Sequence, residues 1–515
     1  MIRFGTDGWR GIIADDFTFE NVRWVSQAIC DYIKISLQPS AISPRPRLIV
    51  GYDTRFLSDR FALEAALVAA ANDFDVLLTE SFAPAPVVSF AVVDKRADGA
   101  ILITASHNPP QYNGLKFKAS FGGSATPEIT GKIEQCYRRN SAWGKKPLKI
   151  SLPRKGAWGE EATQEDRLRF FDPKEAYLSN ILTLLDKNLF PQLPTPNSQL
   201  KVVVDPMYGA GQGYLSEALS RLGCEVVEIH KGMNPTFGGI NPEPSSENLE
   251  DLRCEVKRRG FDVGLAMDGD ADRTGAIDPS GAFIDSHQIF ALLLEHLVNQ
   301  RKWRGEVVKT VSTTQMIDIL SRKYNLPLHV TPIGFKYICE HILTRDVLIG
   351  GEESGGIGIK NYIPERDGIL IGLLLVEIMI THRKTLKELV DDLMKRIGYF
   401  YYDRVDLPAR PVTKGGFAPG GPVGRHGVET ASTVRENLLN YLKTFNPSEL
   451  AGVKVVTIDN MDGCKFLLAD ESWLLIRPSG TEAVVRIYAE ASSPQRVSTL
   501  LKVGQEILDE ARCRS

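Results

Sequence analysis

The chain has 515 residues, of which 43% are hydrophobic and 24% are charged, close to the average for globular proteins. This composition excludes a disordered chain, a collagen and a small disulfide-stabilised domain. A net charge of −3 provides no basic surface for general nucleic-acid binding. At the usual ~100–200 residues per domain, the length predicts three or four domains.

The sequence shows no sign of a membrane or secreted protein. The longest apolar stretch, residues 369–380, is interrupted by Gly372 and Glu377. Because it is shorter than the ~20 residues that span a bilayer, we expect a buried helix. The N-terminal residues have no apolar signal segment, and the seven cysteines include no CxxC pair. We therefore expect a cytoplasmic protein with reduced thiols and no membrane contact.

Short apolar runs alternate with segments of helical periodicity, which predicts βα units. The expected strands are residues 48–50, 100–103, 201–205, 263–267, 307–311 and 347–349. The expected helices are residues 22–33, 214–222, 369–380 and a last one that begins at the Ser-Pro pair 493–494. Prolines concentrate at residues 191–196, which indicates a boundary, and both proline and glycine concentrate at 408–427, which indicates a surface loop.

The first polar loop, residues 104–116, directly follows an expected strand. A serine at the carboxyl end of a strand lies where open α/β sheets bind ligands. Ser106 is therefore a candidate nucleophile or phosphorylated residue, with His107 and Lys116 as charge or proton partners. We expect Gly114 to form a turn that brings Lys116 back towards the hydroxyl. A turn stabilised by Ser and Asn side chains is the alternative.

The second loop, residues 268–273, has the sequence Asp-Gly-Asp-Ala-Asp-Arg. Three crowded carboxylates are costly unless a cation neutralises them, and oxygen ligands suit Mg²⁺. We therefore predict a magnesium site at Asp268, Asp270 and Asp272. An EF-hand is excluded, because its sixth position requires Gly and here is Arg273. A DxDxT aspartyl-phosphate motif with Asp270 as the nucleophile is the alternative.

Two further loops have groups suited to a sugar phosphate. Residues 350–356, Gly-Gly-Glu-Glu-Ser-Gly-Gly, offer donors and acceptors for vicinal sugar hydroxyls. Residues 477–482, Arg-Pro-Ser-Gly-Thr-Glu, form an oxyanion cradle but lack the GxxxxGK[ST] pattern of a nucleotide P-loop. Tight polar turns are the alternative for both. Residues 209–213 do not complete a dinucleotide fingerprint, because Tyr214 replaces its last glycine.

In this order the four loops resemble those of the α-D-phosphohexomutase superfamily, which includes phosphoglucomutases and phosphomannomutases. The likeness begins at residues 4–11, Phe-Gly-Thr-Asp-Gly-Trp-Arg-Gly, and spans nearly the whole chain. The resemblance implies four domains around a central cleft: three related mixed α/β domains and a C-terminal α+β domain that closes over the ligand. We expect these domains at residues 1–190, 191–304, 305–400 and 401–515.

The resemblance also implies roles for individual residues. Ser106 would carry a phosphoryl group and bind Mg²⁺ together with the three aspartates. Arg273, Lys116 and the adjacent His107 would act on the transferred phosphoryl group. The implied substrate-binding residues are Arg10, Lys336, Glu353, Ser354, Arg477, Ser479, Gly480, Thr481 and Arg486.

We therefore expect an isomerase that interconverts glucose 1-phosphate and glucose 6-phosphate, with Mg²⁺ and a glucose 1,6-bisphosphate intermediate. Mannose and glucosamine members of the superfamily more often have Met or Gln before the loop serine and His near the loop end. Glu353 and Gly356 stand there, which favours glucose phosphate. A phosphomannomutase, a glucose 1,6-bisphosphate synthase and a non-catalytic sugar-phosphate sensor are the alternatives. The expected partners are hexose phosphates only, bound by a monomer or dimer.

Overall fold

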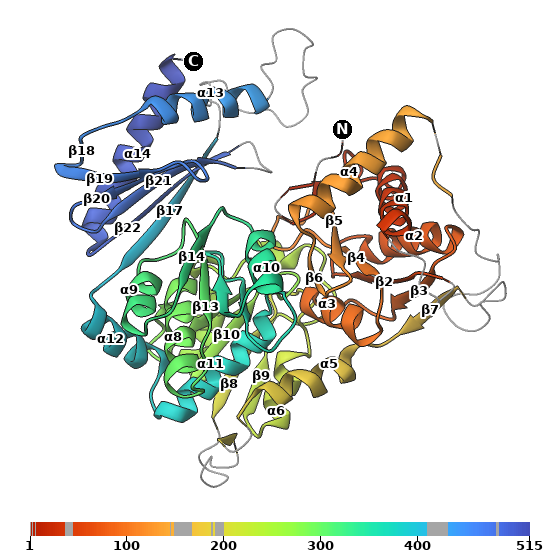
Figure 1. The fold of residues 1–515 in the computed structure, drawn as a ribbon. Coiled ribbons are helices and arrows are strands. Elements are labelled where there is room, and N and C mark those ends of the chain that lie inside the picture. Colours follow the sequence, from red (N-terminus) through yellow and green to blue (C-terminus); the bar gives the residue numbers. More distant parts are fainter. Residues whose placement is uncertain are drawn as a thin grey trace. The chain divides into compact units, whose positions relative to one another are not determined.

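In the computed structural model, the strands of the described residues form four sheets (Figure 1). The residues that it describes are 2, 4–5, 7–36, 45–144, 146–148, 167–186, 189–190, 200–408, 431–479 and 484–514. They divide into two compact units, which we describe separately. The first unit is Met1–Val308, Leu320–His329 and Gly334–Val390, and the second is Lys309–Ile319, Val330–Ile333 and Asp391–Ser515.

The first sheet has the strand order β1-β5-β4-β2-β3-β7, with β6 paired to β5. Its strands are β1 (Trp9–Ile12), β2 (Arg47–Tyr52), β3 (Asp75–Thr79), β4 (Gly99–Ile103), β5 (Tyr112–Ala119), β6 (Gly123–Ser124) and β7 (Leu168–Phe171). Its helices are α1 (Phe19–Ser36), α2 (Ser58–Ala71), α3 (Ala85–Asp94), α4 (Pro127–Ala142) and α5 (Lys174–Ile181). Strands β2, β3 and β4 are parallel. Their side chains are mostly apolar because helices cover them: α2 packs on all three strands, and α3 packs on β2 and β4.

The second sheet has the order β12-β11-β10-β8-β9. Its elements are β8 (Lys201–Asp205), α6 (Leu215–Arg221), β9 (Glu225–Glu228), α7 (Glu250–Arg259), β10 (Val263–Met267), β11 (Thr274–Ile277), β12 (Phe283–Ile284) and α8 (Ser286–Asn299). Strand β10 is parallel to β8 and antiparallel to β11. The turn between β10 and β11 therefore lies at the carboxyl end of a buried strand, where ligands bind in such sheets.

The third sheet has the order β14-β13-β15-β16. Its elements are β13 (Glu306–Thr310), α9 (Met316–Lys323), β14 (Leu328–Thr331), α10 (Phe335–Thr344), β15 (Val347–Gly351), β16 (Ile357–Ile359), α11 (Gly368–His382) and α12 (Leu386–Ile397). Helix α11 is buried on all sides and packs against α6 and α8, so the predicted buried helix is confirmed. Within the described residues, no helix combines the length and the hydropathy needed to cross a bilayer.

The fourth sheet is antiparallel throughout, in the order β17-β22-β21-β20-β19-β18. Its elements are β17 (Tyr401–Pro408), α13 (Ala431–Thr444), β18 (Glu449–Leu450), β19 (Val453–Asp459), β20 (Cys464–Leu468), β21 (Trp473–Pro478), β22 (Val484–Ala491) and α14 (Pro494–Arg514). The second unit also contains two segments that begin at the ends of strands of the third sheet, Lys309–Ile319 at the end of β13 and Val330–Ile333 at the end of β14. A small hydrophobic core packs the fourth sheet against these two segments. That core contains Val311, Ile333, Trp473, Leu475 and Tyr488.

The predicted fold class, three mixed α/β domains followed by an α+β domain, is confirmed. All six predicted strands and all four predicted helices are present, with ends that differ by at most a few residues. The predicted surface loop at 408–427 lies, beyond Pro408, outside the described residues. The four domain boundaries predicted from the sequence stay predictions.

Candidate active site

Ser106 lies in the loop after β4 and is buried. Its φ of 53° is in the left-handed region, which a non-glycine residue occupies at a cost. The backbone N–H of Ser106 donates to Thr104 Oγ1 (2.9 Å), and its hydroxyl donates to Asp268 Oδ2 (2.8 Å). The Nδ1 atom of His107 lies 3.5 Å from the same hydroxyl. The structure thus brings the predicted serine loop and the predicted metal loop together.

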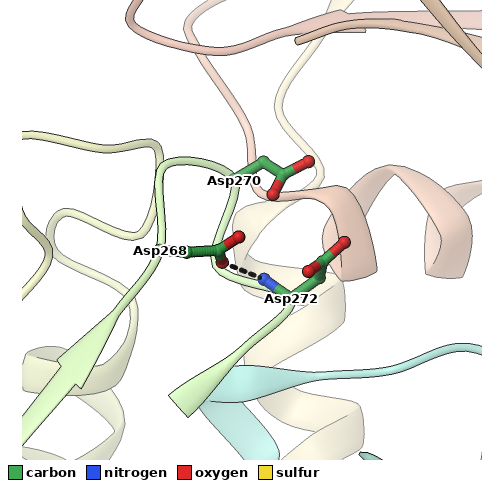
Figure 2. A group of neighbouring side chains, drawn as sticks. All are labelled: Asp268, Asp270 and Asp272. Atoms are coloured by element: carbon green, nitrogen blue, oxygen red, sulfur yellow. Dashed lines mark hydrogen bonds between the residues drawn. The ribbon is translucent and has the colours of Figure 1, made fainter. Parts of the chain in front are cut away.

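Asp268, Asp270 and Asp272 occupy the turn between β10 and β11 (Figure 2). All three are buried, and one oxygen from each lies within 4.8 Å of the others. Asp268 Oδ1 accepts hydrogen bonds from the backbone N–H groups of Asp272 (2.9 Å) and Arg273 (3.1 Å), which fixes the turn. Ala271 adopts φ 57°, so the backbone reverses tightly between the last two carboxylates.

The donor set of this turn fits a divalent cation. Burial, and after it the Asp272 and Asp270 charges, raise the pKa of Asp268 well above its usual range. Among the described residues, Asp270 Oδ1 and Asp272 Oδ1 are buried without a hydrogen-bond partner. Buried carboxylate oxygens that lack donors are the ligands that Mg²⁺ prefers.

Two buried cations partly balance these carboxylates. Lys116 Nζ lies 2.6 Å from Asp7, 2.8 Å from Asp270 and 3.2 Å from Asp272. Arg366 pairs with Asp272 at 2.8 Å and also with Asp7. Burial alone would lower the pKa of Lys116, but Asp270, Asp272 and Asp7 raise it overall, so the amine stays protonated. Burial would also raise the pKa of Asp272, but Arg366 and Lys116 lower it.

The predicted turn at Gly114 is wrong. Gly114 lies inside β5, which runs antiparallel to β4, so the chain reverses earlier, in the loop that contains Ser106. Glycine is required there because a Cβ would lie 2.5 Å from the Thr104 carbonyl oxygen and 2.8 Å from that of Trp9. Lys116 reaches the carboxylates from a rigid strand.

Asp7, Arg366 and Glu352 were not predicted as individual site residues, but they also contribute charged groups to this site. Glu352 is buried and pairs with Arg366 at 2.8 Å, whereas the predicted Glu353 is partly exposed. Burial raises the pKa of Glu352 to about 7, although Arg366 opposes the shift. The sequence did contain a signal for Arg366, because it stands in the charged run Glu365-Arg366-Asp367, immediately before the mostly apolar helix α11.

The other predicted residues of the first unit come from several segments, and Arg273 lies nearest to the carboxylates. Arg273 Nε lies 3.8 Å from Asp272 and 3.9 Å from Asp268, and Arg273 Nη1 lies 3.4 Å from Glu243. Two more cations lie on neighbouring segments: Arg10, on β1, donates to the Asn108 side chain, and Lys336, on α10, donates to the Gly5 carbonyl oxygen (3.3 Å). Ser354 is partly exposed, next to Glu353.

The predicted phosphate cradle belongs to the second unit. Arg477 is the second-to-last residue of β21, is buried, and pairs with Asp462 at 2.8 Å. Arg486 lies opposite it on β22 and pairs with Asp406 at 3.3 Å. Ser479 is buried. The remaining cradle residues, Gly480 and Thr481, lie outside the described residues.

Four family models match the chain in order. They are phosphoglucomutase/phosphomannomutase alpha/beta/alpha domain I over residues 1–143, domain II over 175–281, domain III over 285–397, and the C-terminal domain over 435–502. The chain belongs to the phosphoglucomutase/phosphomannomutase family. It is therefore a phosphohexomutase, an isomerase that moves a phosphoryl group between two positions of a hexose.

Full-length relatives agree with this assignment. A phosphoglucomutase/phosphomannomutase of Thermococcus kodakarensis is 30% identical over 99% of this chain and 98% of its own. A Methanosphaera stadtmanae protein, provisionally named a phosphoglucosamine mutase, is 30% identical over 98% of both chains. A crystal structure from Thermus thermophilus, provisionally described as a phosphomannomutase, is 32% identical over 99% of both chains, with a TM-score of 0.79. These relatives are named for different hexose phosphates, so membership of the family determines the class of reaction but not the hexose.

Proposed function

We propose that this phosphohexomutase interconverts glucose 1-phosphate and glucose 6-phosphate, with Ser106 as the residue that carries the transferred phosphoryl group. The observation that supports this role is the 2.8 Å hydrogen bond between the Ser106 hydroxyl and Asp268, inside a buried group of three carboxylates. A strained serine held beside a candidate cation site suits phosphoryl transfer, which depends on positioning and charge stabilisation.

In the first half-reaction, O6 of glucose 1-phosphate attacks the phosphorus on Ser106. The O6–P bond forms, the bond from phosphorus to Ser106 Oγ breaks, and the O6 proton ends on Ser106 Oγ. Lys116 and Arg273, both buried beside the carboxylates, stabilise the charge on the transferred group. In the second half-reaction the bisphosphate, turned end for end, returns its C1 phosphoryl group to Ser106. The bond from Ser106 Oγ to phosphorus forms, the O1–P bond breaks, and the serine proton ends on O1 of the product, glucose 6-phosphate.

Asp268, Asp270 and Asp272 would hold Mg²⁺, with Ser106 or its phosphoryl oxygen as a further ligand. When bound, the ion would neutralise charge on the phosphoryl oxygens. Asp268 also accepts the Ser106 hydrogen bond, which fixes the direction of the hydroxyl beside the three carboxylates. Arg477, Ser479, Gly480, Thr481 and Arg486 would hold the phosphate that is not reacting.

Glucose is favoured over other hexoses by the loop Gly351–Gly356, where Glu353 precedes Ser354 and Gly356 closes the loop. The test is turnover of glucose, mannose and glucosamine 1-phosphates with Mg²⁺ and a trace of the matching bisphosphate. We expect the highest kcat/KM for glucose 1-phosphate. A higher value for either other hexose would contradict the glucose assignment but not the mutase activity.

A glucose 1,6-bisphosphate synthase and a sugar-phosphate sensor are tested in the same assay. A mutase needs only catalytic bisphosphate, whereas a synthase consumes a phosphoryl donor stoichiometrically, and a sensor binds without turnover. Mapping the phosphorylated residue separates Ser106 from the rival nucleophile Asp270.

The cation site has its own test, Asp270→Asn. Because this change removes one charged ligand of the cation, we expect Mg²⁺-dependent activity to fall by ~10²-fold or more. Activity should be titrated against Mg²⁺ for both proteins. Asp278→Asn, which alters another buried carboxyl of the same sheet, is the matched control and should titrate like the wild type. An unchanged Mg²⁺ dependence in Asp270→Asn would contradict the site.

A further inference from the structure

Arg55 lies just beyond the end of β2, and its side chain is completely buried. Its guanidinium donates to four backbone carbonyl oxygens: three in the loop between β4 and β5, which contains Ser106, and one in the first residue of β5. These oxygens belong to Ser106 (2.6 Å), Asn108 (2.5 Å), Pro109 (2.9 Å) and Tyr112 (3.0 Å). One rigid cation therefore fixes both ends and the middle of this loop.

The guanidinium is itself held in place on two sides. Asp53 Oδ2 lies 3.2 Å from Arg55 Nε, and Asp53 Oδ1 accepts from the Arg55 backbone N–H (3.0 Å) and from the Ser58 hydroxyl (2.7 Å). The ring of Phe237 lies 4.9 Å from the guanidinium carbon. These contacts hold the guanidinium N–H groups in one orientation, towards the loop between β4 and β5 (residues 104–111), which we call the serine loop.

The loop needs such an anchor because its active conformation is strained. Ser106 is held at φ 53°, and its carbonyl oxygen lies so close to Gly269, in the turn between β10 and β11, that a Cβ on Gly269 would lie 2.4 Å from it. The carbonyl of Ser106 thus lies between Arg55 and Gly269. Releasing it would let the backbone relax and would turn the hydroxyl away from Asp268.

We propose that Arg55 is a positioning residue of the mutase reaction, which holds the serine loop so that Ser106 Oγ lies beside Asp268. It acts through Ser106 and contacts no reacting atom. The proposal rests on the proposed phosphoryl-carrying role of Ser106. An ammonium group cannot replace the guanidinium, because a lysine has no planar fork that reaches four carbonyl oxygens at once.

The test compares Arg55→Lys with the wild type and with Arg47→Lys. Arg47 begins the same strand, pairs with Asp75 at 2.9 Å and donates to the Lys95 carbonyl oxygen, so it is a matched control that does not contact the serine loop. Phosphorylation of Ser106 by glucose 1,6-bisphosphate is followed by intact mass in single-turnover mixing, alongside kcat, KM and Tm.

For Arg55→Lys we expect kcat and the rate of Ser106 phosphorylation to fall together by ~10–10²-fold, with KM within about twofold. Arg47→Lys should change neither rate. Equal phosphorylation rates in Arg55→Lys and wild type would overturn the inference. If the wild type acquires no phosphoryl group on Ser106, the proposed function fails instead.

Asp53→Asn keeps Arg55 but removes the negative charge that holds its guanidinium in place. This variant tests the positioning role if Arg55→Lys does not fold. We expect a smaller fall in the phosphorylation rate at unchanged KM, by a few-fold. An unchanged rate in folded Asp53→Asn, or a loss confined to KM, would contradict positioning by Arg55.

Discussion

Three separate segments of the chain determine the position of the Ser106 hydroxyl. Arg55 follows β2, Thr104 follows β4, and Asp268 follows β10, so each segment begins at the carboxyl end of a buried strand. Each contact restrains a different atom of the serine: the carbonyl oxygen, the N–H and the hydroxyl. The side chain therefore has little rotational freedom to lose when a phosphoryl group is transferred.

Replacing this serine is the most direct test at the residue scale. Ser106→Ala removes the nucleophile, so we expect turnover to fall by at least ~10³-fold while Tm changes little. Turnover is measured with glucose 1-phosphate and trace bisphosphate. Ser26→Ala, in a buried serine of α1, is the control and should keep normal turnover. Near-normal activity of Ser106→Ala would refute the phosphoserine.

Glu352 predicts a pH dependence of stability. Burial raises its pKa from 4.5 to about 7, so between these values the folded chain holds a proton that the unfolded chain has released. Stability from this group is fully present below about pH 4.5 and is lost as the pH rises through 7, by at most about 3 kcal/mol.

The variant Glu352→Gln lacks this titration. We therefore expect its Tm, relative to the wild type, to rise by several degrees as the pH increases from about 4.5 to 7 and to level off above that range. The measurement is thermal unfolding of the metal-free protein across this range. Glu353→Gln, which changes the adjacent partly exposed carboxylate, should follow the wild type. A constant difference in Tm between Glu352→Gln and wild type would contradict the raised pKa.

At the scale of elements, the serine loop and the β10–β11 turn are in direct contact. Gly269→Ala would place a Cβ 2.4 Å from the Ser106 carbonyl oxygen, so one of the two backbones must move. We expect kcat to fall by ~10²-fold or more. Gly131→Ala, in α4, is the control, because a Cβ there meets no described atom within 4 Å. It should keep full activity and gain up to ~1 kcal/mol in stability.

The elements were predictable because their apolar runs have the periods of strands and helices. The aspartate turn was also predictable, since its three carboxylates are adjacent in sequence. The position of Lys116 was not, because Gly114 signals a turn locally but serves the close packing of two strands. Arg55 and Arg366 were missed for a similar reason: their partners are distant in sequence, and only the folded chain brings these groups together.

At the scale of the whole molecule, the reacting and non-reacting phosphates would be bound by different units. Arg477→Ala removes the cation proposed to hold the non-reacting phosphate, so we expect KM to rise by ~10-fold or more, with a smaller change in kcat. Steady-state kinetics with glucose 1-phosphate provide the measurement. Arg496→Ala, which breaks a pair with Asp470 in the same unit, is the control. A fall in kcat at constant KM would contradict the role of Arg477.

The second unit is not a continuous stretch of chain. Its smaller hydrophobic core includes Val311 and Ile333, which lie in two segments far before Asp391 in the sequence. A gene fragment starting at Asp391 would therefore expose part of the apolar surface of Trp473, Leu475 and Tyr488, and its product should aggregate on expression. To produce the two units separately, the second unit must therefore include Lys309–Ile319 and Val330–Ile333. These segments can be added as separate peptides or joined to the fragment by a linker.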